Sequence, residues 1–129
     1  MTGCRPGVVG IGTDAVDIER FRRILQRTPG FAARVFTADE LAYATTRNDP
    51  TERLAARFAA KEATMKALGV GLGACRLRDI EVGRVASGRP HLVLHGRAAD
   101  LAGELHVARW HLTMTHTAIV SFAVVVAEG

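Results

Sequence analysis

The amino-acid sequence predicts an α+β fold in which an antiparallel sheet packs against one long central helix and several shorter helices. Three observations support this prediction. The chain has 129 residues, which is the size of one domain, and we expect residues 1–129 to form a single one. One helical pattern is much longer than the rest, and strand-like alternation of apolar and polar residues dominates the second half of the chain.

The first third of the chain predicts one strand and two helices. An apolar run at residues 8–13 predicts a short buried strand that leads to Asp14. Apolar residues at helical spacing predict a helix over residues 15–26. Thr37, followed three residues later by a glutamate, matches a capping box and predicts a second helix through about residue 47.

A long helix is expected over residues 51–69, with Thr51 as its N-cap and a glycine-rich segment at its end. At about 100° per residue, large apolar side chains gather on one side of this helix and alanines on the opposite side. A helix that is apolar on two sides is expected to be buried on two sides. Because the alanine face carries only methyl groups, it permits a close approach of the first strand, which presents Gly10 and Gly12.

The second half of the chain predicts strands separated by turns, with one short helix over residues 98–105. A turn at residues 87–90 joins two alternating segments, as in a hairpin. The expected strands are residues 79–85, 91–95, 107–116 and 118–127.

The last of these strands is apolar on both faces. One face carries Val120, Phe122, Val124 and Val126, and the other carries Ile119, Ala123 and Val125. One sheet covered by one helical layer leaves a sheet face open. We therefore expect a second subunit to cover that face, so that the fold is completed by oligomerisation.

The chain is basic, with a net charge of +4 and a sequence pI of about 9.8. Such a charge is typical of nucleic-acid-binding domains. However, the aromatic residues are scattered and offer no stacking platform, and no helix-turn-helix or zinc-ligand spacing occurs. We therefore expect no nucleic-acid partner. The alternative to an enzyme is a non-catalytic binding module for acidic partners, whether protein or nucleic acid.

The sequence indicates a protein of the cytoplasm. The longest apolar run, residues 118–127, is interrupted by Ser121 and is too short to span a bilayer, so no membrane insertion is expected. The start of the chain lacks the long apolar stretch of a secretion signal. Cys4 and Cys75 form no CxxC pair and are expected to be free thiols.

Two carboxylates and a lysine form the strongest candidate site. The close approach of the first strand to the long helix is expected to bring Asp14 beside Glu62, with Lys66 one turn further along the helix. The alternative is an ordinary surface ion pair between Glu62 and Lys66. Converging carboxylates next to a lysine suit Mg²⁺ and a phosphate ligand, because Mg²⁺ takes only one or two protein carboxylates and completes its shell with phosphate and water. Both lysines of the chain, Lys61 and Lys66, lie in this helix, which suggests that a compact ammonium is required there.

Three segments resemble motifs of the 4′-phosphopantetheinyl transferases, and in particular of the small holo-acyl-carrier-protein synthase type. The first is VGIGTD at residues 9–14, and the second is FAAKEATMKA at residues 58–67. The third is the shorter TMTH at residues 113–116, while residues 88–90 resemble the family's usual turn between strands. The resemblance spans nearly the whole chain, in order.

The resemblance implies transfer of 4′-phosphopantetheine from coenzyme A to a serine of an apo acyl carrier protein for fatty acid or polyketide synthesis. It implies Mg²⁺ as the cofactor, with Mn²⁺ as an alternative, and a homotrimer with active sites between subunits. The metal would be held by Asp14 and Glu62, and the implied catalytic residues are Asp14, Glu62, Lys66 and His116. Coenzyme A would be held by Arg57, Glu62, Lys66, Gly69, Gly88, Arg89, Pro90, Thr115 and His116.

Two questions stay open at the level of sequence. The proton of the carrier serine could pass to Glu62 directly or through a metal-bound water, because both routes need only a nearby carboxylate. The preferred carrier could belong to fatty acid, polyketide or peptide synthesis, and the residues do not distinguish these partners.

A basic segment is expected to contact the carrier protein. Residues 20–36 contain five arginines and no acid. A solvated basic helix is the alternative interpretation. Because carrier proteins are acidic helical bundles, complementary charge would speed their encounter with this segment, and we expect Arg20, Arg23 and Arg27 to form the docking face.

Overall fold

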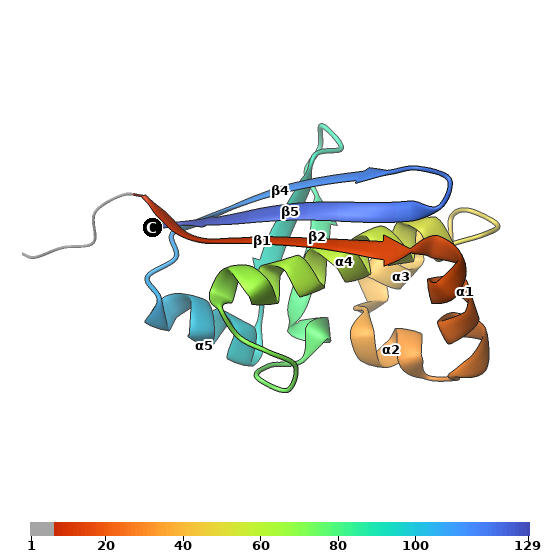
Figure 1. Cartoon of the computed structure of the whole chain (residues 1–129), viewed down its shortest axis with the longest axis horizontal. Coiled ribbons are helices and arrows are strands. Elements are labelled where there is room, and N and C mark those ends of the chain that lie inside the picture. The colour runs from red at the N-terminus through yellow and green to blue at the C-terminus, as the bar shows by residue number, and fades with distance from the viewer. Residues whose placement is uncertain (1–6) are drawn as a thin grey trace, which may run out of the picture.

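The computed structural model describes residues 7–129 and confirms the α+β class. Five strands and five α-helices follow one another along this part of the chain (Figure 1). The elements are β1 (Val8–Asp17), α1 (Ile18–Arg27), α2 (Phe31–Val35), α3 (Ala38–Ala44), α4 (Thr51–Leu68), a 3₁₀ turn (Leu77–Asp79), β2 (Ile80–Arg84), β3 (Pro90–Leu94), α5 (Gly96–Glu104), β4 (Arg109–His116) and β5 (Val120–Glu128).

The strands form two antiparallel sheets rather than the single sheet expected. In the larger sheet the strand order is β1-β5-β4, so that the C-terminal strand lies in the middle. The strands β2 and β3 form a separate hairpin. The single-sheet prediction was wrong because alternation identifies strands but not their hydrogen-bonding partners, and α5 separates β3 from β4 along the chain.

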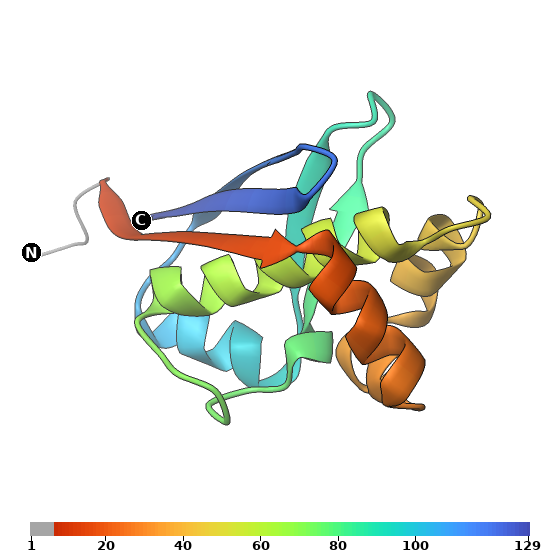
Figure 2. The same cartoon turned by 45° about the vertical axis from the view of Figure 1, so that its right-hand side comes forward.

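Helix α4 runs through the centre of the molecule, with β1 and β5 along one side of it (Figures 1 and 2). The predicted alanine face packs under the larger sheet and shares a core with the inward side chains of β5. This core includes Ala59, Ala60, Ala63, Ala67, Ala123, Val125 and Ala127. The contact with β1 is backbone against backbone: a Cβ atom built at Gly10 would lie 1.9 Å from the carbonyl oxygen of Ala67, and one built at Gly12 would lie 1.7 Å from that of Ala63.

The short helices begin where side chains cap them. Strand β1 continues to Asp17, so α1 begins three residues later than predicted. Asp17 Oδ1 accepts a hydrogen bond of 2.7 Å from the backbone N–H of Arg20 and thereby caps α1. The predicted capping box of α3 is confirmed, because Thr37 and Glu40 each accept a hydrogen bond from the backbone N–H of the other. This helix ends at Ala44, earlier than expected, and α2 was not predicted.

The long helix starts differently from the prediction. Its N-cap is Pro50 and Thr51 is its first residue, so the assignment of Thr51 as the cap was wrong. The backbone N–H of Thr51 instead donates to Asp49 Oδ1 at 3.0 Å. Hydrogen bonds from Thr51, together with one from Arg22, hold the pKa of Asp49 at about 2. The helix ends as expected at Gly69, whose φ of 72° is a left-handed conformation that favours glycine.

Lys61 of α4 is completely buried. Its ammonium donates to Glu40 Oε1 at 2.8 Å, to the carbonyl oxygen of Leu77 at 3.0 Å and to that of Ile80, which uses all three of its protons. The buried Glu40 also accepts a hydrogen bond of 3.0 Å from the backbone N–H of Val82. A compact ammonium suits this enclosed site better than a planar guanidinium would. The network ties α3, the 3₁₀ turn and β2 to α4.

The face of the larger sheet that is turned away from α4 keeps apolar surface. The residues of β5 alternate between buried and half-buried, and the half-buried ones include Phe122, Val124 and Val126. Ile11 of β1, which alternates with the glycines that face α4, is 61% exposed. One chain alone therefore leaves this face incompletely covered, as the pattern of the last strand predicts.

Two further predictions concern single features. Cys75 is a free thiol, as expected, whereas Cys4 lies outside the described residues. Within residues 7–129, the helices are all too short or too polar to cross a membrane.

Candidate active site

Asp14 on β1 and Glu62 on α4 are near enough for their charges to interact, as predicted from the glycine and alanine faces. Lys66, one turn further along α4, donates to the carbonyl oxygen of Thr13 at 2.9 Å and lies 3.3 Å from Asp14 Oδ1. The ammonium therefore pairs with Asp14. The alternative, a surface ion pair between Lys66 and Glu62, is not formed. We call Asp14, Glu62 and Lys66 the carboxylate cluster.

Glu62 has a raised pKa. Partial burial disfavours its ionised carboxylate, and the negative charge of Asp14 adds to this effect, while Lys66 acts in the opposite direction. A divalent cation would relieve the repulsion, and carboxylate oxygens are ligands that Mg²⁺ prefers. No group of three or more His, Cys, Asp or Glu side chains converges within residues 7–129. With the two carboxylates of Asp14 and Glu62, the cluster suits a cation that completes its shell with phosphate or water.

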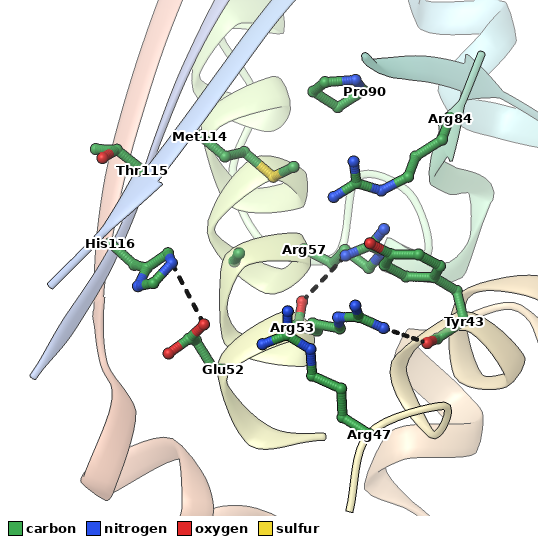
Figure 3. A pocket seen from close by; sticks show the side chains of 11 residues that line it. Tyr43, Arg47, Glu52, Arg53, Arg57, Arg84, Pro90, Met114, Thr115 and His116 are labelled. Carbon is green, nitrogen blue, oxygen red and sulfur yellow. Dashed lines mark hydrogen bonds and ion pairs between the residues drawn. The ribbon is translucent and has the colours of Figure 1, made fainter. Parts of the chain in front are cut away.

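A separate cavity of about 290 Å³ lies between the start of α4, the β2–β3 hairpin and the end of β4 (Figure 3). We call it the arginine pocket because four arginines line it, whereas its lining includes one acid, Glu52. The lining residues are Tyr43, Arg47, Glu52, Arg53, Ala56, Arg57, Arg84, Pro90, Met114, Thr115 and His116.

Arg57 is the most enclosed of these arginines, with 2% of its surface exposed. Its Nη1 donates to the carbonyl oxygen of Arg53 at 3.4 Å, and its Nε finds no hydrogen-bond partner in the described part of the chain. Burial and the nearby charge of Arg84 lower its pKa. No carboxylate of residues 7–129 forms an ion pair with any of the four arginines. Because a buried unpaired cation is unfavourable, the pocket is suited to an anionic ligand.

His116 is the last residue of β4 and lies at the edge of the arginine pocket (Figure 3). Its Nε2 is 3.3 Å from Glu52 Oε1, and both side chains are partly exposed. The imidazole is therefore accessible to a ligand in the pocket.

The structure divides the site residues predicted from sequence between these two places. The carboxylate cluster contains Asp14, Glu62 and Lys66. The arginine pocket contains Arg57, Pro90, Thr115 and His116. Three further residues belong to neither, since Gly69 ends α4 while Gly88 and Arg89 lie in the β2–β3 turn. Within one chain, no residue lines the pocket and also belongs to the cluster.

Sequence reasoning missed most of the arginine pocket. Arg53 and Arg57 are four residues apart on one helix, and this spacing could have identified Arg53. Tyr43, Arg47 and Arg84 come from α3, the loop that follows it, and β2, and no local pattern links them.

A third cavity, of about 340 Å³, connects the carboxylate cluster to α1, because Asp14 and Arg20 both line it. We call it the α1 groove. Its apolar walls are formed by Ala15, Val16, Phe21, Ile24 and Phe58. Arg20, Arg23 and Arg27 together line a shallow depression on the same helix. The three predicted docking residues thus share one surface, which is continuous with the groove through Arg20.

Comparison with known proteins agrees with this geometry. A model of the 4′-phosphopantetheinyl transferase superfamily matches residues 10–121, and the chain belongs to this superfamily. Within it, the chain is similar to the holo-[acyl-carrier-protein] synthases. That of Moorella thermoacetica is 48% identical over 118 residues, which cover 92% of each chain.

Solved structures of such synthases superimpose on this chain. The structure from Neisseria meningitidis has a TM-score of 0.85 and 36% identity, and the match covers 95% of this chain and 100% of that one. The structure from Bacillus anthracis, in complex with CoA (3′,5′-ADP), has a TM-score of 0.79 and 33% identity, with coverage of 95% and 97%.

Proposed function

We propose that the carboxylate cluster and the arginine pocket serve one reaction, the transfer of 4′-phosphopantetheine from coenzyme A to a serine of an apo acyl carrier protein. The chain is a transferase, and its relatives carry out this activity under the name holo-[acyl-carrier-protein] synthase. The observation that carries the proposal is the pair of mutually repelling carboxylates, Asp14 and Glu62, held beside Lys66. A non-catalytic binding module is not favoured, because it would not need such a pair.

The arginine pocket is proposed to hold the nucleotide end of coenzyme A. Its unpaired guanidinium groups match phosphate in charge and in hydrogen-bonding geometry. Arg57 would provide the enclosed cation, and His116 would close the pocket from the end of β4. The relative from Bacillus anthracis was solved in complex with CoA (3′,5′-ADP), which supports coenzyme A as the kind of ligand that this chain binds.

Asp14 and Glu62 are proposed to hold Mg²⁺, with Mn²⁺ as the alternative. When bound, the metal ion withdraws charge from the pyrophosphate of coenzyme A. Lys66 is placed to stabilise the negative charge that develops on the leaving adenosine 3′,5′-bisphosphate, because its ammonium is exposed and lies next to Asp14. Phosphoryl transfer requires positioning and charge stabilisation more than covalent help from the protein.

Glu62 is proposed to accept the proton of the carrier serine, directly or through a water molecule. Its carboxylate lies beside Asp14 and Lys66, where the reacting phosphate would be held, so it is placed to accept a proton. The serine oxygen then forms its bond to the phosphorus of phosphopantetheine, the pyrophosphate P–O bond to adenosine 3′,5′-bisphosphate breaks, and the proton remains on Glu62 or the water.

A homotrimer is proposed to bring the two sites together. Within one chain the carboxylate cluster and the arginine pocket have no residue in common, although coenzyme A must reach both. The incompletely covered face of the larger sheet, which includes Ile11 and Phe122, supports contact with another copy. We place the assembly in the cytoplasm, as expected from the sequence.

The acyl carrier protein is proposed to dock on α1. Arg20, Arg23 and Arg27 would attract its acidic surface, and the α1 groove would lead its serine to Asp14. Reversing charge with the double variant Arg20→Glu, Arg23→Glu should raise the KM for carrier protein while leaving coenzyme A binding unchanged. An equal loss of both affinities would contradict docking at this surface.

The reaction is tested by the intact mass of apo acyl carrier proteins after incubation with this chain, coenzyme A and Mg²⁺. Carriers from fatty acid, polyketide and peptide synthesis should be compared side by side, with Glu62→Gln and metal-free reactions as controls. The expected result is a gain of one phosphopantetheine that is lost in both controls. No gain on any carrier would refute the proposed function.

A further inference from the structure

Tyr43 lies in α3 and contributes its ring to the arginine pocket, where it contacts three guanidinium groups (Figure 3). The Cζ atoms of Arg53, Arg57 and Arg84 lie 4.2, 4.4 and 4.7 Å from the ring centroid. Two of these arginines belong to α4 and one to β2. A single aromatic ring thus joins the cations of two separate elements.

Three guanidinium groups at these distances repel one another, and no carboxylate within residues 7–129 pairs with them. The face of an aromatic ring attracts cations through its quadrupole, and the attraction is stronger where water is excluded. Since Arg57 is buried against the ring, Tyr43 offsets part of this repulsion before any anion is bound.

Backbone and hydroxyl oxygens hold two of the arginines in place. Arg53 Nη1 donates to the carbonyl oxygen of Tyr43 at 2.9 Å and to Thr46 Oγ1 at 2.7 Å, and Arg84 Nη1 donates to the carbonyl oxygen of Gly88. In the described part of the chain, these bonds occupy one nitrogen of each guanidinium. The other nitrogens of both groups stay available to an incoming phosphate.

We infer that Tyr43 is a positioning residue for phosphate binding, whose ring holds Arg53, Arg57 and Arg84 in place before a phosphate group of coenzyme A arrives. The inference rests on the proposed function, which places coenzyme A in this pocket. Cations that are already ordered bind an anion more tightly, because binding need not then restrict their side chains.

The test is titration calorimetry of coenzyme A with Tyr43→Leu and Tyr43→Phe, together with steady-state kinetics on an apo carrier. Tyr43→Leu removes the ring, and we expect Kd and KM for coenzyme A to rise about tenfold while kcat stays within about twofold. Tyr43→Phe keeps the ring and should bind coenzyme A as tightly as the unmodified chain, since the hydroxyl has no role in the inference. Where the leucine variant fails to fold, Tyr43→Gln provides a ring-free side chain of similar reach.

A second measurement separates positioning from a general loss of structure. In the background Arg53→Gln, Arg84→Gln, removal of the ring should weaken coenzyme A binding by less than about twofold, because two of the groups that the ring holds are already absent. A full tenfold loss in that background would overturn the inference, as would unchanged affinity in Tyr43→Leu or failure of Tyr43→Phe to restore binding. Absence of coenzyme A binding by the unmodified chain would instead overturn the proposed function, and the inference with it.

Discussion

Replacing Gly12 with alanine is expected to force β1 away from α4. The new Cβ would lie 1.7 Å from the carbonyl oxygen of Ala63 and 2.8 Å from the backbone nitrogen of Ala67. Ordinary contacts of such an atom begin at 3.4 Å, so the strand must retreat by about 1.7 Å. Because the opposing atoms belong to the backbone, no change of rotamer can relieve the clash.

The cost of this displacement falls on both stability and activity. Overpacking costs about 1–3 kcal/mol where side chains can yield, and here we expect a loss of at least about 3 kcal/mol in the free energy of unfolding. Asp14 is two residues from Gly12 and would move away from Glu62, and a misplacement of about 1 Å can lower a rate about 100-fold. Strand propensity predicts the opposite sign for stability, because glycine is unfavourable within strands.

The assay is urea unfolding followed by circular dichroism, together with transfer activity on an apo carrier. Gly103→Ala in α5 is the matched control, because a Cβ at Gly103 meets nothing within 4 Å. This control should gain about 0.5–1 kcal/mol, as alanine does over glycine inside a helix. A Gly12→Ala chain with unchanged unfolding free energy and full activity would refute the backbone contact between β1 and α4.

Three further predictions concern the buried pair, the carboxylate cluster and a helix cap. Lys61→Met should lower the free energy of unfolding by about 3–5 kcal/mol in urea titrations, because Glu40 is left buried and unpaired, and adding Glu40→Gln should recover part of the loss. The raised pKa of Glu62 means that its carboxyl proton is bound more tightly in the folded chain than in the unfolded chain. The free energy of unfolding therefore falls as pH rises from the pKa of Glu62 in the unfolded chain to its higher pKa in the folded chain. In metal-free buffer, Glu62→Gln should therefore raise the melting temperature at neutral pH more than below about pH 4. An equal rise in melting temperature at the two pH values would contradict the raised pKa of Glu62. Asp17→Ala should cost about 1 kcal/mol in the same titrations by removing the cap of α1, whereas Asp17→Asn keeps the acceptor and should cost less.

The contact that forms the carboxylate cluster could be predicted from the sequence, because the spacing of small residues within one strand or one helix shows which face can pack closely. Gly10 and Gly12 share one face of a strand, and the alanines of α4 share one face of a helix, so their periodicities alone predict a close approach. Asp14 and Glu62 follow from that geometry. The pairing of strands into two sheets could not be predicted, because alternation does not identify the partner of a strand.

The arginine pocket and the buried lysine depend on distant parts of the chain. Tyr43 and Arg84 meet Arg57 only after α3 and β2 have packed against α4, and nothing near them in sequence indicates it. Lys61 would usually be expected at the surface, and its burial depends on Glu40, 21 residues away. Such features result from tertiary packing and not from local pattern.

The three acceptors of Lys61 also determine how α4 is turned about its own axis. They belong to α3, the 3₁₀ turn and the start of β2, so that rotation of the helix would break hydrogen bonds to three elements at once. Glu62 is the next residue and projects about 100° further around the helix. The direction in which Glu62 points toward Asp14 is therefore held by a neighbour that is sealed from solvent. A substitution at Lys61 would allow α4 to rotate about its axis. It would thereby move Glu62 and lower activity, although Lys61 itself contacts no ligand.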